Sequence, residues 1–263
     1  MRTENKRDVA CWGRNLEGQS APPAGTFTQV TASYYYSCGV RTDGTLACWG
    51  ANDQGQSSPP AGTFAQVTGG DGHSCGLRTD GTLACWGRNN FGQSTAPTGT
   101  FTQADAGYDH TCGLKTDGTL ACWGYDYYGQ STPPTGRFSR LLVTAGGFHT
   151  CELQTDGTFA CWGSNLNGQS TPPAGTFTRL AAGSAHTCGL KTDGALACWG
   201  YNVYGQSTPP AGTFAGVAAG DLHTCGLKTD GTLACWAPTP TAKAHPPPAH
   251  SLTSLRAART PAD

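Results

Sequence analysis

Two short runs that carry the apolar residues flank an Asp-Gly pair in the segment CGLKTDGTLACWG, residues 112–124. Short runs of this kind around Asp-Gly are typical of a β-hairpin. If residues 116–118 form a three-residue loop with Gly118 in the left-handed conformation, Leu114 faces Leu120 across the hairpin. The pattern therefore predicts a strand, a tight turn and a returning strand.

The same register places one cysteine opposite another. Cys112 faces Cys122 at a non-hydrogen-bonded pair, where opposed alpha carbons lie about 4.5 Å apart, at the short end of the disulfide range. The same offset recurs along the chain and predicts the disulfides Cys38 with Cys48, Cys75 with Cys85, Cys112 with Cys122, Cys151 with Cys161, Cys188 with Cys198 and Cys225 with Cys235. Cys11 is left over, and because its partner would lie just before Met1, we expect the chain to start inside a repeat.

Two other interpretations of these cysteines are small core residues in a reducing cytosol and metal thiolates. Structural zinc usually uses CxxC pairs, and the sequence has none. Because both cysteines are present in every complete hairpin, we favour disulfides, which form in an oxidising compartment.

A Cys-Trp pair recurs at residues 11, 48, 85, 122, 161, 198 and 235, a spacing of 37 residues with one interval of 39. Each unit divides into GQST, a PPAG turn, a strand such as TFTQVTAG, and the hairpin, and sheets of this kind stacked radially form a propeller. The fold class is therefore all-β, a β-propeller over residues 1–236 of 37-residue and 39-residue repeats. We expect seven blades with a truncated first blade, and six blades are the alternative. The Pro- and Ala-rich residues 237–263 drop the repeat and are expected to be disordered or a linker.

Composition narrows the class of protein further. The chain has 38 Gly, 17 Pro and 13% charged residues, which disfavours helical repeats. Its formal net charge of -1 is scattered, so we expect no nucleic-acid partner and no binding to an anionic membrane surface. No apolar run approaches the roughly 20 residues of a membrane span, so no membrane insertion is expected. The start MRTENKRD lacks the apolar core of a signal peptide, so a secreted protein would have lost its signal from this sequence.

Residues 110–130, HTCGLKTDGTLACWGYDYYGQ, resemble the regulator of chromosome condensation (RCC1) repeat. Its Trp-Gly-x-Asn-x-x-Gly-Gln form stands at Trp12–Gln19, Trp49–Gln56, Trp86–Gln93, Trp162–Gln169 and Trp199–Gln206, and at Trp123–Gln130 with Asp126 for the Asn. The resemblance implies a seven-bladed β-propeller used as a docking platform. Members of that family include exchange factors for small GTPases that also bind chromatin, a plant ultraviolet receptor and a secreted bacterial β-lactamase inhibitor. Two departures are the Ser-Thr or Ser-Ser that follows most Gly-Gln pairs and the paired cysteines.

The repeats differ from one another mainly in two stretches, just before the His and between Trp-Gly and Gly-Gln. Both must lie on the face opposite the Asp-Gly turns, because the strands that bound them run to and from those turns. Tyrosine supplies large contact area with few torsions to freeze, so binding loops use it heavily. The candidate partner-binding residues are Tyr34, Tyr35, Phe91, Tyr108, Tyr125, Tyr127, Tyr128, Phe148, Tyr201 and Tyr204. The alternative is that these rings merely cover the ends of the blades.

The remaining repeated residues are better explained by structure than by chemistry. The histidines that recur once per repeat, His73, His110, His149, His186 and His223, are expected to form hydrogen bonds within or between blades, and Tyr36 replaces one of them. No paired carboxylates on a cleft, phosphate loop or nucleophile elbow is present, so we expect no catalytic residue, no metal site and no cofactor.

The sequence therefore predicts a non-enzymatic module that binds a protein partner through the tyrosine-rich loops, as an extracellular or cell-envelope binder or inhibitor. One alternative is a cytoplasmic regulator with guanine-nucleotide exchange activity on a small GTPase. Another is carbohydrate binding, because aromatic rings also stack on sugars.

Overall fold

The computed structural model describes residues 9, 11, 15–136, 138, 142–154 and 158–237. These residues form an all-β structure of six three-stranded antiparallel sheets, without a helix in the part of the chain that is described. The strands are β1 (Phe27–Ala32), β2 (Tyr36–Arg41), β3 (Leu46–Gly50), β4 (Phe64–Gly69), β5 (His73–Arg78), β6 (Leu83–Gly87), β7 (Phe101–Ala106), β8 (His110–Lys115), β9 (Leu120–Gly124), β10 (Leu142–Ala145), β11 (His149–Leu153), β12 (Phe159–Gly163), β13 (Phe177–Ala182), β14 (His186–Lys191), β15 (Leu196–Gly200), β16 (Phe214–Ala219), β17 (Thr224–Lys228) and β18 (Leu233–Trp236).

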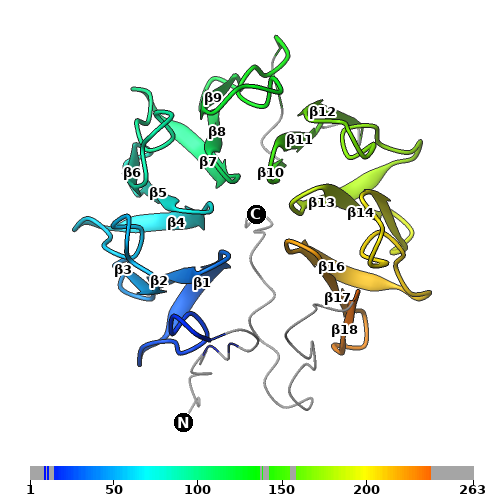
Figure 1. Ribbon diagram of the computed structural model, residues 1–263, viewed down its shortest axis with the longest axis horizontal. Coiled ribbons are helices and arrows are strands. Elements are labelled where there is room, and N and C mark those ends of the chain that lie inside the picture. Colours follow the sequence, from blue (N-terminus) through cyan, green and yellow to red (C-terminus); the bar gives the residue numbers. More distant parts are fainter. Residues whose placement is uncertain are drawn as a thin grey trace.

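Each sheet is one blade, and its strands pair in chain order. The blades stand around a central axis with β1, β4, β7, β10, β13 and β16 nearest to the centre (Figure 1). Six blades are therefore seen, and the expected seventh, truncated blade falls on residues 1–14, which lie outside the described residues apart from 9 and 11. The seven-blade expectation stays a prediction, as does the disorder expected for the tail, since residues 238–263 are also outside the described part.

The hairpin register follows the sequence pattern. Leu114 pairs with Leu120, and Gly118 adopts the left-handed φ of 83° that the three-residue loop requires. The turn aspartates cap their own loops, as shown by Asp43, whose carboxylate accepts hydrogen bonds from the backbone N–H and the hydroxyl of Thr45 at 2.9 and 2.7 Å.

The disulfide prediction is confirmed in all six hairpins. The bonded pairs are Cys38–Cys48, Cys75–Cys85, Cys112–Cys122, Cys151–Cys161, Cys188–Cys198 and Cys225–Cys235, with Cα–Cα distances of 4.0 to 4.1 Å. Among the described residues Cys11 is the free cysteine, and burial raises the pKa of its thiol.

Inside five of the six described blades, a phenylalanine at the start of the inner strand packs over the middle of the second strand. Phe101 is 2% exposed, and a Cβ added to Gly113 would lie 2.7 Å from its ring. Where the ring lies this close, a residue larger than glycine would have to displace it, and glycine stands at this place in five of the six described blades. In the fourth blade Glu152 stands there instead, fully buried, and among the described residues neither carboxylate oxygen has a hydrogen-bond partner. Burial raises the pKa of Glu152 to about 8.

Four of the five recurring histidines join their blade to the next, which confirms the structural assignment for these four, while that of His223 stays a prediction. Nε2 lies 2.8 Å from the threonine hydroxyl of the following blade in the pairs His73 with Thr111, His110 with Thr150, His149 with Thr187 and His186 with Thr224. The Thr187 hydroxyl donates its own proton to the Gln169 carbonyl at 3.1 Å, so it must accept from the His149 ring. Nε2 therefore carries the proton, and Nδ1 of His149 is a buried atom without a hydrogen-bond partner in the described structure.

The tyrosine that replaces the histidine in the first blade performs the same connection. The Tyr36 hydroxyl donates to the His73 carbonyl of the second blade and accepts from the Ser74 hydroxyl at 2.9 Å. Tyr36 is fully buried, and this burial raises its pKa to about 12. The first two blades are thus joined by a neutral hydrogen-bond network, like the blades that follow.

Candidate functional site

We define the loop face as the end of the propeller opposite the Asp-Gly turns. It carries two kinds of loop, the inner loops between the first and second strand of a blade and the connecting loops that lead from one blade to the next. The inner loops are residues 33–35, 70–72, 107–109, 146–148, 183–185 and 220–223. The described connecting loops are residues 15–19, 51–56, 88–93, 125–130, 164–169 and 201–206.

Five of the six described connecting loops are closed by their own asparagine and glutamine. The Asn89 side-chain oxygen accepts from the Ser94 backbone at 2.9 Å, and its nitrogen donates to the Thr95 hydroxyl at 3.0 Å. The Gln93 side-chain oxygen accepts from the Phe91 backbone at 2.8 Å. The Ser-Thr that departs from the family pattern is therefore part of the loop closure.

The loop with Asp126 in place of asparagine is closed in the same way. Its carboxylate accepts from the Ser131 backbone at 2.6 Å and from the Thr132 hydroxyl at 2.7 Å. A carboxylate accepts both bonds where asparagine accepts one and donates one, because the threonine hydroxyl can take either part.

The loops are also fixed to the next blade. The Gln93 carbonyl accepts a hydrogen bond of 2.8 Å from the indole N–H of Trp123 in the third blade. The equivalent Trp-to-Gln bonds measure 2.8 to 3.0 Å at every blade, and their donors are Trp49, Trp86, Trp123, Trp162, Trp199 and Trp236. We call the two residues between the asparagine, or Asp126, and the Gly-Gln pair the tip of a loop, as in Tyr127 and Tyr128. The hydrogen bonds that fix the loop do not use the side chains of the tip.

The first residue of the tip is the most exposed of the large hydrophobic residues on this face. Its exposed fraction is 78% at Leu16, 77% at Tyr127, 79% at Leu166 and 73% at Val203. Sequence reasoning singled out the aromatic residues and missed these three aliphatic side chains. The signal that was available is their position, two residues before each Gly-Gln pair.

Six of the ten candidate rings form one continuous group, the six-ring cluster of Phe91, Tyr108, Tyr125, Tyr127, Tyr128 and Phe148. Phe91 lies 4.8 Å from Tyr125, and Phe148 lies 5.4 Å from Tyr108 and 5.8 Å from Tyr128, measured between ring centroids. Tyr125 also stacks on Tyr127 at 6.3 Å. The rings come from loops of three successive blades, and Tyr127, Phe91 and Tyr128 are 77%, 46% and 39% exposed.

The other four candidate rings lie elsewhere on the loop face. Tyr34 and Tyr35 contact each other at 4.5 Å in the inner loop of the first blade. Tyr201 and Tyr204 contact each other at 6.2 Å in the last connecting loop. The structure therefore divides the ten predicted residues into one large group and two pairs.

Backbone hydrogen bonds link the inner loops around the axis. Tyr108 accepts from the Asp71 N–H at 3.2 Å and donates to the Gly147 carbonyl at 3.3 Å, and Gly147 donates to the Ser184 carbonyl at 3.1 Å. The Tyr108 hydroxyl donates to the Asp221 carboxylate at 2.6 Å, which connects the third blade to the sixth. Tyr108 is thus both a member of the six-ring cluster and a fixed part of the inner loops.

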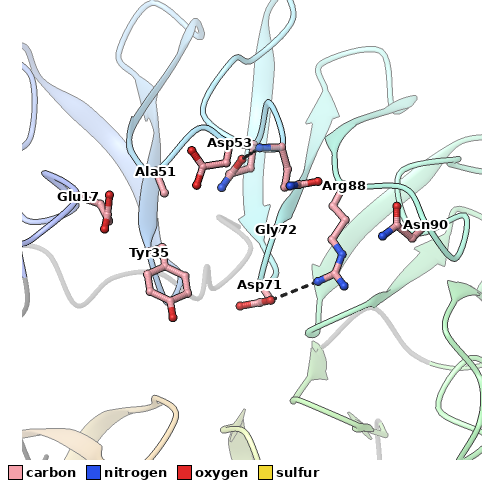
Figure 2. A pocket seen from close by; sticks show the side chains of 10 residues that line it. Glu17, Tyr35, Ala51, Asp53, Asp71, Gly72, Arg88 and Asn90 are labelled. Carbon is pink, nitrogen blue, oxygen red and sulfur yellow. Dashed lines mark hydrogen bonds and ion pairs between the residues drawn. The ribbon is translucent and has the colours of Figure 1, made fainter.

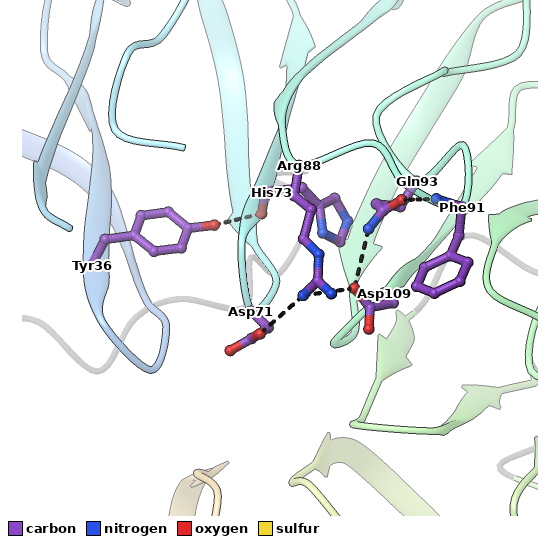
Figure 3. A network of polar contacts seen from close by, with 7 residues as sticks. All are labelled: Tyr36, Asp71, His73, Arg88, Phe91, Gln93 and Asp109. Atoms are coloured by element: carbon purple, nitrogen blue, oxygen red, sulfur yellow. Dashed lines mark hydrogen bonds and ion pairs between the residues drawn. The ribbon is translucent and has the colours of Figure 1, made fainter. Parts of the chain in front are cut away.

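A polar network lies beside the cluster, on the second and third blades. The Arg88 guanidinium lies 3.5 Å from the Asp71 carboxylate and 3.3 Å from that of Asp109, and the Gln93 side chain donates to Asp109 at 3.1 Å (Figure 3). Burial raises the pKa of Asp71, the nearby charge of Asp109 raises it further, and Arg88 opposes both. This part of the face is therefore electronegative despite the arginine.

A shallow cleft of about 360 Å³ opens between the first two blades. Glu17, Tyr35, Asp53 and Asp71 lie around the opening, and Arg88 borders it (Figure 2). Its carboxylates and tyrosine ring suit a cationic or hydrogen-bond-donating group.

Within the described residues, no group of three or more His, Cys, Asp or Glu side chains is arranged to hold a metal ion. The part of the chain that is described has no helix both long and apolar enough to cross a membrane.

The profile of the regulator of chromosome condensation (RCC1) repeat matches the chain once in each blade, at residues 27–56, 64–93, 101–130, 142–169, 177–206 and 214–236. The ectodomain of the receptor kinase CR4 from Physcomitrella patens is similar at 30% identity and a TM-score of 0.77, over 90% of this chain and 69% of that one. The CRINKLY WD40 ectodomain of the receptor kinase ACR4 from Arabidopsis thaliana is similar at 27% identity and a TM-score of 0.69, over 84% of each chain.

Prp20p from Saccharomyces cerevisiae has the same fold at 19% identity and a TM-score of 0.69, over 79% of this chain and 71% of that one. A comparison with the curated proteins found no match. The match of the repeat profile in all six described blades, together with the similarity to the CR4 ectodomain, shows that the chain belongs to the family of regulator of chromosome condensation (RCC1) repeat β-propellers.

Proposed function

We propose that this propeller is a non-enzymatic protein-interaction module that binds its partner through the loop face, outside the cytoplasm. The observation that carries the proposal is the six-ring cluster, a continuous group of aromatic rings on hydrogen-bonded loops, in which Phe91, Tyr127 and Tyr128 are exposed. Exposed apolar surface of this kind in a soluble protein usually marks an interaction site.

The construction of the loops supports tight binding. Binding loops lose affinity when their side chains and backbone must be ordered on association. Here the asparagine, glutamine and tryptophan hydrogen bonds already hold the backbone, so a partner would order only the side chains of the tips. Tyrosine has few torsions to freeze, so the cost of ordering Tyr127 and Tyr128 would be small.

The six disulfides favour an extracellular location, because such bonds persist in oxidising compartments. The similarity to two receptor-kinase ectodomains points the same way. Protein binding also agrees with the similarity to Prp20p, a protein with binding properties to Gsp1p and histones. The carbohydrate alternative draws no support from these similarities.

The test compares the unmodified chain with a loop-face double variant, Tyr127→Ala and Tyr128→Ala, and a turn-face control, Thr98→Ala. Thr98 is exposed and precedes the inner strand, at the end of the third blade opposite the loop face. Each protein is immobilised, exposed to secreted and cell-surface proteins of the native host, and cross-linked. A partner that the unmodified chain and the control retain, and that the double variant loses by tenfold or more, supports the proposal.

Equal retention by the double variant would place the interface elsewhere and contradict the proposal. Stimulated nucleotide release from a small GTPase would favour the exchange-factor alternative, and it would do so most clearly if the cysteines were found reduced. Binding on a glycan array that Tyr127→Ala abolishes would favour the carbohydrate alternative.

A further inference from the structure

The charges of the two ends of the propeller differ. At the described turns of the turn face, five basic residues each have an aspartate two residues away, in the pairs Arg41 with Asp43, Arg78 with Asp80, Lys115 with Asp117, Lys191 with Asp193 and Lys228 with Asp230. The described loops of the loop face carry six acidic residues and one basic residue, which are Glu17, Asp53, Asp71, Asp109, Asp126 and Asp221 against Arg88. The described part of the loop face is therefore anionic, although the whole chain is nearly neutral.

The anionic residues lie among the aromatic rings. Asp126 immediately precedes Tyr127 in the same loop, and Asp221 accepts the Tyr108 hydroxyl at 2.6 Å. Asp109 directly follows Tyr108 of the six-ring cluster in the chain, and its carboxylate lies 3.3 Å from the Arg88 guanidinium. A partner that covers the rings must therefore also face these carboxylates.

The cluster continues into the cleft between the first two blades. The connecting loop of residues 88–93 supplies Phe91 to the cluster and Asn90 to the lining of the cleft. Glu17 and Asp53 of the same lining are exposed, and Tyr35 lies between Glu17 and Asp71 (Figure 2). Aromatic and anionic groups thus extend together from the fourth blade to the first.

A partner segment rich in aspartate or glutamate would place like charges together, which opposes its binding. Lysine and arginine satisfy both features, because their cations are attracted to the faces of tyrosine rings and pair with carboxylates. Their long alkyl stems also cover apolar surface such as Phe91.

We propose that the loop face docks a lysine- or arginine-rich segment of a partner protein, with its cationic side chains against the tyrosine rings and carboxylates of the cluster and the cleft. This inference rests on the proposed function of the loop face and adds the chemistry of the partner.

The probe is a displayed library of random twelve-residue peptides, selected on the unmodified protein at 0.15 M salt. The expected result is enrichment of lysine and arginine, with affinity that falls as salt rises. A loop-face charge variant, Glu17→Gln with Asp53→Asn, should bind the selected peptides about tenfold more weakly. Its matched control, Ala61→Lys with Thr98→Lys, makes the same change in net charge at two exposed residues of the turn face and should bind normally.

The variant Tyr127→Ala separates this inference from the proposed function. Peptides that lose affinity with Tyr127→Ala but are neutral or acidic, or are indifferent to the Glu17 and Asp53 substitutions, would overturn the basic partner and leave the docking face intact. If selection yields only peptides indifferent to all of these loop-face changes, or no peptide at all, both the inference and the proposed docking face are contradicted.

Discussion

The buried histidines predict that the propeller loses stability in mild acid. His73, His110, His149 and His186 are fully buried, and burial lowers their pKa values from 6.5 to about 4, 3, 3 and 4. Each ring already donates through Nε2, and its Nδ1 is a buried atom without a hydrogen-bond partner in the described structure, so protonation would place a charge and a second N–H in a buried position. The native state therefore resists protonation, whereas the unfolded chain does not.

The sign and size of the effect follow from linkage. Above pH 6.5 the rings are neutral in both states and contribute nothing to the pH dependence. As the pH falls below 6.5, the unfolded chain binds protons that the folded chain rejects, so stability is lost. At pH 5 each histidine stabilises the unfolded state by about 2 kcal/mol relative to neutral pH, or about 8 kcal/mol for the set.

The buried carboxyl of Glu152 opposes this loss. Its folded pKa of about 8 lies above the 4.5 of the free side chain, so the folded state holds a proton that the unfolded chain releases as the pH rises between these values. Between pH 7 and pH 5 this opposes the histidines by up to about 3 kcal/mol, which leaves a net loss of about 5 kcal/mol. A change of that size is comparable with the whole stability of many domains.

The assay is urea unfolding at pH 5, 6, 7 and 8 with the disulfides intact, followed by tryptophan fluorescence. The variant His110→Gln keeps a donor for the Thr150 hydroxyl and removes one titrating ring, so its loss of stability between pH 7 and pH 5 should be smaller than that of the unmodified protein by about 2 kcal/mol. Equal stability of the unmodified protein at pH 5 and pH 7, or an unchanged pH dependence in His110→Gln, would refute the reasoning.

Three further outcomes are expected. Thiol alkylation without reductant, on protein from the native host, should label Cys11 alone by intact mass, and labelling of all thirteen cysteines would contradict the extracellular location. Gly107→Ala should lower the free energy of unfolding by roughly 1–3 kcal/mol or more, because the new Cβ would lie 2.3 Å from the carbonyl oxygen of the next blade's Gly146, whereas Gly216→Ala meets nothing closer than 3.9 Å and should change it little. Glu152→Gln should remove the contribution that opposes the histidines, so the variant should gain on the order of 2–4 kcal/mol more stability than the unmodified protein as the pH rises from about 5 to 9, and an unchanged pH dependence in urea unfolding would argue against a neutral buried carboxyl.

Much of the fold is local, and local features can be predicted from the sequence. The Asp-Gly turn sets the hairpin register, and the register alone brings Cys112 opposite Cys122. The period of the repeat then supplies the blades. The number of blades cannot be predicted in this way. It depends on how the first and last repeats of the ring meet, and a repeating pattern contains no information on that contact.

The candidate site was predicted in outline but not in arrangement. The strand directions place all ten candidate rings on one face, yet the contact of Phe91 with Tyr125 joins loops that are a full repeat apart. The bond from Tyr108 to Asp221 crosses the ring between positions 113 residues apart. Both contacts depend on the angle between neighbouring blades, which cannot be predicted from the sequence pattern.

The same geometry explains how the loop tips can vary while the propeller stays the same. The hydrogen bonds that close a loop use the Asn89 and Gln93 side chains and backbone atoms of the tip, so the fold depends on the tip only through its main chain. Tyr127 and Leu166 occupy equivalent tip positions at 77% and 79% exposure, although one is aromatic and the other aliphatic. A substitution there changes exposed surface and little else, and its effect on stability should stay within about 0.5 kcal/mol. Selection for a partner can therefore act on the tips of the loops almost independently of selection for the fold.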